Sequence, residues 1–279
     1  MDSQIKTKLL IFRKILISIV IWIVFLLLFS ILLGFFFKDA SLLAPQFAFI
    51  MTSLFLIYLI DKKDYKSIGI NDKNCINNAF YGIIGGVLIT FLSVILMIFF
   101  ADSIISNRDF NLSLIVYQMI LFLLVAIGEE LYFRGYILQI FDNLNNPNWS
   151  LFISTIFFAL IHLLNPNSLS KPFLFLSIEI VNIFLLGFLF AIARFKSGGL
   201  IMPIALHFSI NFIQSSIFGF VNGGKKMDSL FNIEVHRNSI LNGSGYGLES
   251  SLILTIISIS TIYFLKNKNY KYEKNIKNH

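Results

Sequence analysis

The sequence has few charged residues and a single cysteine, and both shortages exclude classes of protein. Charged residues make up 13% of the 279 residues. A soluble domain usually has about a quarter, so a single water-soluble fold is excluded. Cys75 is the one cysteine, so it forms no internal disulfide and cannot supply the several thiolates of a cysteine zinc site. Disulfides and cysteine-bound zinc therefore do not hold this fold.

The positive net charge does not indicate a nucleic-acid partner. The net charge is +7, but the basic residues flank long apolar segments, as membrane topology requires. Five lysines lie in the last stretch, residues 266–279, which we interpret as a solvated basic tail in the cytoplasm. We therefore expect a lipid bilayer, and no nucleic acid, as the surroundings of the chain.

Apolar residues dominate the composition, at 57%, and they are grouped in long runs. A bilayer is crossed by about 20 apolar residues in a helix. The pattern predicts an all-α, polytopic membrane helix bundle, about eight transmembrane helices in a single membrane domain over 1–279. Asn222–Glu249, rich in Gly, Asn and Ser, is predicted to be a mobile connection. The expected spans are Ile15–Phe37, Leu42–Ile60, Ala79–Phe100, Leu112–Phe141, Trp149–Leu164, Pro172–Ala193, Leu200–Val221 and Leu252–Leu265.

The distribution of basic residues orients these spans. With the N-terminus inside, the inner segments hold fifteen Lys and Arg residues and the outer loops hold six. This asymmetry predicts that both termini are cytoplasmic, which an even number of spans allows. The first apolar run is longer than the apolar part of a signal peptide and lacks a small-x-small cleavage site, so we expect it to be retained. The predicted location is a multi-pass protein of the plasma membrane.

Polar and ionisable residues interrupt the apolar pattern in four consecutive predicted spans. An ionisable side chain near the bilayer centre costs roughly 2.5–3.5 kcal/mol, so such residues are expected to face a protein-lined or hydrated cavity and to compensate one another. They are functional candidates for the same reason. The interrupting residues are Glu129, Glu130, Arg134, His162, Glu179, Asn182, His207 and Asn211.

Helical spacing predicts how these residues pair. Residues four apart share a helix face, so Glu130 and Arg134 are expected to form an ion pair, whereas Glu129 lies about 100° around the helix and stays free. If consecutive spans form hairpins, a rise of about 1.5 Å per residue brings Glu129 and His162 to similar depths. His207 and Asn211 share a face and fall in the same layer.

Such a layer suits hydrolysis of an amide by an activated water. A partly desolvated carboxylate beside an imidazole is a competent general base. A second histidine and an asparagine supply donors where an oxyanion develops in acyl transfer. The nucleophile-elbow pattern G-x-S-x-G is absent, so no covalent serine intermediate is predicted.

Three short motifs in this region resemble a known family. Residues Glu129 to Arg134 fit EExxxR, Phe158 and His162 fit FxxxH, and His207 and Asn211 fit HxxxN. Their order and their position in apolar helices resemble the membrane family of CAAX prenyl proteases and bacteriocin-processing or immunity proteins (CPBP, also called Abi), which includes Rce1. The signature occupies a predicted core over residues 112–221.

The resemblance implies an intramembrane glutamate protease whose catalytic cavity opens to the cytosol. In that family the residue matching Glu129 activates water together with the match to His162. The match to Glu130 assists, and Arg134 holds the motif in place. His207 and Asn211 match the oxyanion-stabilising pair. The implied substrate is a membrane-embedded or lipid-anchored peptide, including a prenylated CAAX-type peptide.

Some assignments stay open at the level of sequence. Glu179 matches no motif, and both a structural partner for Arg134 or a histidine and a substrate contact fit it; Phe158 is expected to pack beside His162. No cofactor is expected, although Glu129, His162 and His207 form a His₂Glu set that suits zinc. Two further functions use the same residues: a non-catalytic immunity or scaffold protein, and a proton-relay transporter, for which inverted repeats are missing.

Overall fold

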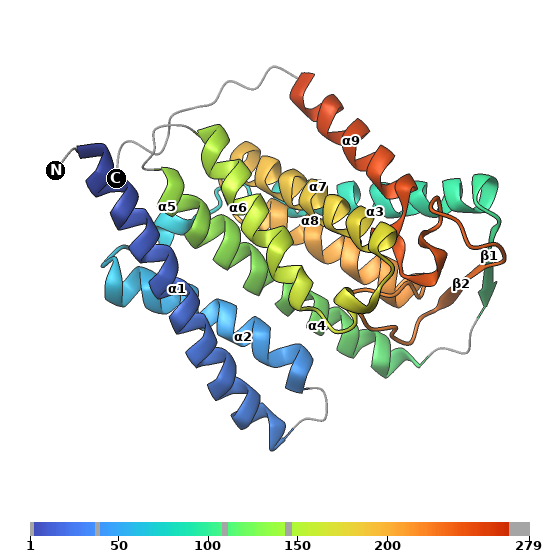
Figure 1. Cartoon of the computed structure of the whole chain (residues 1–279), viewed down its shortest axis with the longest axis horizontal. Coiled ribbons are helices and arrows are strands. Elements are labelled where there is room, and N and C mark those ends of the chain that lie inside the picture. Colours follow the sequence, from blue (N-terminus) through green and yellow to red (C-terminus); the bar gives the residue numbers. More distant parts are fainter. Residues whose placement is uncertain (1–2, 37–39, 108–110, 143–146, 268–279) are drawn as a thin grey trace.

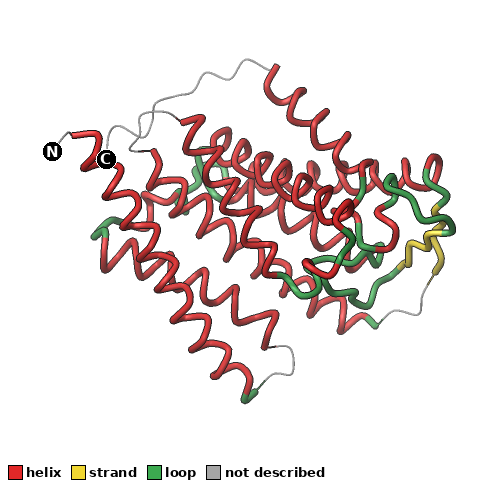
Figure 2. The backbone as a smooth tube through the Cα atoms, viewed as in Figure 1, coloured by secondary structure: helices red, strands yellow, loops and turns green. Residues whose placement is uncertain are grey.

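The computed structural model describes residues 3–36, 40–107, 111–142 and 147–267, and helices dominate them (Figures 1 and 2). The all-α architecture predicted from the sequence is confirmed. Each of the eight apolar segments forms a helix, and the first helix begins at Ser3 rather than at the predicted Ile15. The elements are α1 (Ser3–Gly34), α2 (Ala40–Phe55), α3 (Cys75–Phe100), β1 (Ser103–Asn107), α4 (Leu112–Glu130), α5 (Leu138–Asp142), α6 (Pro147–Ile161), α7 (Phe173–Ser197), α8 (Ile201–Phe212), β2 (Phe231–Val235) and α9 (Leu252–Asn267).

Within the described residues, five helical segments are long and apolar enough to cross a membrane, and three further apolar helices have 10–17 residues. The shorter ones are 148–164, 201–217 and 252–266. Large apolar side chains are exposed along α1 and α3, the reverse of a soluble protein, because lipid rather than water faces them. The chain is a multi-pass integral membrane protein, and in the part of it that the structure describes all eight predicted segments are apolar helices.

Helix α8 lies in the middle of the bundle, and α4 packs against both α8 and α2 (Figure 1). Helix α8 packs against α3, α4 and α7. Helices α1 and α2 pack against each other, and they contact the rest of the bundle where α2 meets α4 and α1 meets α5. The contact between α3 and α8 is close because Gly82 and Gly86 face it. A Cβ atom at Gly82 would lie 2.5 Å from the carbonyl oxygen of Met202. Small residues allow membrane helices to approach in this way.

The long connection between α8 and α9 contains regular structure. Strand β2 pairs antiparallel with β1, which joins α3 to α4, and the two strands lie at one end of the bundle (Figure 2). Residues 243–245 and 248–250 form short 3₁₀ turns that lead into α9. The connection predicted over Asn222–Glu249 therefore contains regular structure, because its backbone hydrogen-bonding groups find partners in a strand and in tight turns. That the connection is mobile stays a prediction.

Parts of the predicted topology lie outside the described residues. Most of the basic tail (266–279) belongs to them, since the description ends at residue 267. Two of the outer basic residues, Lys38 and Arg108, are also outside it. The cytoplasmic location of both termini stays a prediction.

Candidate active site

The EExxxR motif lies in one continuous helical run over 112–142 that changes its winding in the middle. Helix α4 ends at Glu130, a π-helical turn spans Leu131–Ile137, and α5 continues the run. Every residue of the π turn is buried. Single π turns inside α-helices are frequent at functional sites, because they shift the faces on which the flanking side chains project.

Glu130 and Arg134 form the predicted ion pair, and neither side chain is exposed. The Arg134 Nη1 atom lies 3.0 Å from Glu130 Oε1. The same carboxylate oxygen accepts from His207 Nδ1 at 3.0 Å, so Glu130 joins α4 to α8. Arg134 Nη2 donates to the carbonyl oxygen of Gly187 in α7 at 2.7 Å. Three helices are thereby held around one buried charge pair.

Aromatic rings surround the Arg134 guanidinium. Its Cζ atom lies 4.2 Å from the centroid of the Phe158 ring and 5.5 Å from that of Phe190. Cation–π contacts of this kind offset part of the cost of desolvating a charge. Phe158 also lies 4.6 Å from the His162 ring, as expected from the sequence, and Phe190 stacks on His207 at 4.6 Å. Both histidine rings are thus fixed by packing.

Glu129 points away from the ion pair and toward both histidines. Its Oε2 atom lies 3.8 Å from His162 Nε2 and 3.9 Å from His207 Nε2. This oxygen is buried and has no hydrogen-bond partner among the described residues. Separations above 3.5 Å exceed a direct hydrogen bond and suit polar groups bridged by one small molecule. The sequence-based expectation that Glu129 stays free of Arg134 is confirmed.

Hydrogen bonding assigns the protons of the two histidine rings. His162 Nδ1 lies 2.7 Å from the carbonyl oxygen of Phe158, which can only accept, so Nδ1 carries the proton. His207 Nδ1 donates to the Glu130 carboxylate by the same logic. In each neutral ring the Nε2 atom that faces Glu129 then has a free lone pair.

Glu179 has different partners from those considered at the level of sequence. Its Oε2 atom pairs with Lys171 and accepts from Ser250 Oγ at 3.0 Å. Among the described residues, Arg134 and the two histidines instead contact groups of α4, α6 and α7. Glu179 is buried and links α7 to the turn that precedes α9.

Asn211 belongs to a chain of polar side chains that the sequence did not reveal. Gln214 Nε2 donates to Asn211 Oδ1 at 3.3 Å and to Glu249 Oε1 at 3.1 Å. Gln214 lies in the π turn after α8, and Glu249 in the turn before α9. A search for charges within apolar spans misses both, because Gln214 is neutral and Glu249 lies in a connection.

The residues considered for zinc meet at one point. Glu129, His162 and His207 converge as described, from α4, the end of α6 and α8. Yet no group of three or more His, Cys, Asp or Glu side chains in the described ranges has an arrangement that could hold a metal ion. The expectation that no cofactor is needed stays a prediction.

Comparison with known proteins agrees with the motifs. Residues 111–213 match the model of a family described as Rce1-like, type II CAAX prenyl endopeptidase. All three motifs lie inside this segment, so the resemblance seen in the sequence is confirmed there. No curated protein matches the chain. The matched family is one of membrane proteases, and the segment it covers builds the site.

Proposed function

We propose that the chain is an intramembrane endopeptidase that hydrolyses a peptide bond through a water activated by Glu129 and His162. One observation carries this proposal. A buried carboxylate oxygen without a hydrogen-bond partner in the described chain faces two imidazole Nε2 atoms at 3.8 and 3.9 Å. Because an ionised Glu129 and the Nε2 atom of a neutral His162 only accept hydrogen bonds, the point between them favours a molecule that donates hydrogen bonds, such as water.

In the proposed reaction, Glu129 is the general base. It takes a proton from the water while His162 Nε2 accepts the other hydrogen bond, and the water oxygen attacks the peptide carbonyl carbon. When the tetrahedral intermediate collapses, the carbon–nitrogen bond breaks and Glu129 returns the proton to the leaving amine. The products are a carboxylate and an amine, and no covalent enzyme intermediate forms.

His207 and Asn211 are proposed to stabilise the oxyanion. In its doubly protonated form His207 donates from Nδ1 to Glu130 and from Nε2 to the developing charge. Glu130 contacts His207 Nδ1 at 3.0 Å, and Arg134 holds the Glu130 carboxylate in place at 3.0 Å. Glu130 and Arg134 thus assist through His207, while Phe158 packs against the Arg134 guanidinium and the His162 ring.

The proposed substrate is a membrane-associated peptide, including a prenylated CAAX-type peptide. The site lies among apolar helices, and the matched family is described by its CAAX prenyl endopeptidase activity. A lipid-anchored peptide would reach such a site from the bilayer. We place the protein in the plasma membrane with both termini in the cytoplasm, and we propose that it needs no cofactor.

Turnover of a prenylated reporter peptide by the purified chain in detergent tests the proposal. Glu129→Gln and His162→Gln should each lower kcat by at least about 10²-fold, as loss of a general base does. Glu234→Gln, on the exposed strand β2, is the matched control and should keep wild-type turnover. Cleavage by Glu129→Gln at the wild-type rate would overturn the mechanism.

Two further results separate the alternatives. Activity that is lost in chelator and restored by zinc would replace the water mechanism by a metal-assisted one. A wild-type chain that cleaves no peptide but protects cells from a toxic peptide, with Glu129→Gln protecting equally well, would support the immunity function instead.

A further inference from the structure

Gln214 connects the proposed oxyanion donor to a carboxylate from another part of the chain. Its side chain is fully buried, and its Nε2 group donates to Asn211 Oδ1 on one side and Glu249 Oε1 on the other. Among the described residues, Asn211 makes no other hydrogen bond through its side chain. With its oxygen held by Gln214, the amide NH₂ of Asn211 is turned away from Gln214.

The carboxylate decides this orientation. An ionised carboxylate only accepts hydrogen bonds, so Glu249 requires the NH₂ end of Gln214 rather than its oxygen. That NH₂ group in turn requires the oxygen of Asn211, which leaves the Asn211 NH₂ as a donor. We propose that Glu249 is a positioning residue that, through Gln214, aims the Asn211 amide at the oxyanion. This inference rests on the proposed function.

The backbone around Glu249 is itself fixed to the bundle. Asn182 in α7 donates to the carbonyl oxygens of Glu249 and Ser251 at 2.7 and 2.8 Å. Ser250 donates to Glu179, which pairs with Lys171. The connection between α8 and α9 is therefore fixed to the bundle at the point where it meets the site. Glu249 thereby has the rigid placement that a positioning residue needs.

The charge of Glu249 depends on its neighbours. Burial raises the pKa of Glu249, and the nearby Glu179 carboxylate raises it further, while His162, Gln214 and Lys171 lower it. Below that pKa the protonated Glu249 is a donor, and the NH₂ end of Gln214 is no longer required. The Asn211 orientation is then fixed only at a pH at which Glu249 is ionised.

Replacing Glu249 by residues that keep or lose the acceptor tests the proposal. Glu249→Gln keeps an acceptor oxygen for Gln214 and should retain kcat within about threefold of the wild-type value. Because Gln has no carboxylate to protonate, this variant should lose less activity at acidic pH than the wild-type chain does. Glu249→Leu removes the acceptor and should lower kcat by up to about 100-fold with KM nearly unchanged, as misplacement of a catalytic group does. Equal losses in both variants, or a change in KM alone, would overturn it.

A double-mutant cycle locates the effect. In an Asn211→Ala chain, Glu249→Leu should cost nothing further, because the donor that it positions is already gone. Additive losses would show that Glu249 acts on something other than Asn211 and would reject the proposal. Glu234→Gln is the control from the same connection.

A readout without substrate separates this inference from the proposed function. In selectively ¹⁵N-asparagine-labelled protein, the side-chain amide signal that disappears in Asn211→Ala identifies Asn211. It should shift in Glu249→Leu and in Gln214→Met and stay near its wild-type position in Glu249→Gln and Glu234→Gln. An unmoved signal in Glu249→Leu overturns the positioning role. Absent turnover with a shifted signal would reject the protease function alone.

Discussion

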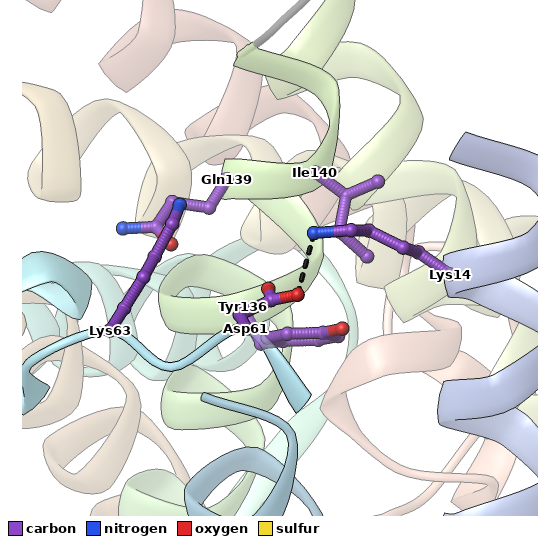
Figure 3. A pocket seen from close by; sticks show the side chains of 6 residues that line it. All are labelled: Lys14, Asp61, Lys63, Tyr136, Gln139 and Ile140. Atoms are coloured by element: carbon purple, nitrogen blue, oxygen red, sulfur yellow. Dashed lines mark hydrogen bonds and ion pairs between the residues drawn. The ribbon is translucent and has the colours of Figure 1, made fainter. Parts of the chain in front are cut away.

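The helical run over 112–142 borders two ion pairs in very different surroundings. On its inner side Arg134 meets Glu130 at 3.0 Å, with neither side chain exposed. The second pair lies outside the run, where Lys14 of α1 meets Asp61 at 2.6 Å beside Tyr136 (Figure 3). The Lys14 side chain is 23% exposed. The peripheral pair is the shorter one.

The difference shows that distance alone does not measure the importance of a charge pair. Lys14 and Asp61 line a small pocket with Lys63, and their side chains are 23% and 9% exposed, so water has some access to the pair (Figure 3). Arg134 and Glu130 have no such access, and removal of one leaves the other charged inside the bundle. Breaking the central pair is therefore expected to destabilise the fold more than breaking the peripheral pair.

The largest predicted effect breaks the central pair. Arg134→Met should lower the free energy of unfolding by about 3–5 kcal/mol, since it leaves the Glu130 carboxylate buried without its main partner. Unfolding in mixed micelles of mild and denaturing detergent measures this. Arg13→Met, on an exposed position of α1, is the matched control and should change stability by less than about 0.5 kcal/mol.

A double variant sharpens the same prediction. Glu130→Leu combined with Arg134→Met removes both charges and should recover part of the lost stability, because no unpaired charge remains. A double variant less stable than Arg134→Met alone would contradict the idea that the buried charge causes the loss.

The second effect extends the comparison to packing. Gly82→Ala should cost about 1–3 kcal/mol, because its new Cβ would lie 2.5 Å from the Met202 carbonyl oxygen and 2.7 Å from Ala205 Cβ. Gly34→Ala, in α1, is the control, with nothing within 4 Å of its new Cβ. Equal stabilities of the two variants would show that α3 can move away from α8.

The smallest effect concerns the peripheral pair. Lys14→Met should cost at most about 1 kcal/mol, with a smaller difference at high salt, since Lys14 and Asp61 are within reach of solvent. The same detergent titration at low and high salt measures it. A loss as large as that of Arg134→Met would remove the distinction between the two regions.

Much of the site follows from local rules that a sequence contains. The four-residue spacing of Glu130 and Arg134 fixes their contact within one helix, and the adjacent Glu129 necessarily projects elsewhere. The positions of the apolar helices follow from the length of their apolar runs. Glu179 shows the limit of such rules, since its partner Lys171 lies in a connection whose path no helical spacing describes.

The sequence by itself determined that this is a bundle of apolar helices in which one carboxylate, Glu129, lies beside the Glu130–Arg134 ion pair. Helical periodicity and the cost of buried charge act over a few residues, so a sequence contains both. Only the tertiary structure decided that His207 reaches Glu130 across 77 positions of the chain, and that Gln214 links Glu249 to Asn211. Those contacts depend on which helix faces meet and on how a long connection folds back. Packing of the whole chain sets both, and no local pattern encodes them.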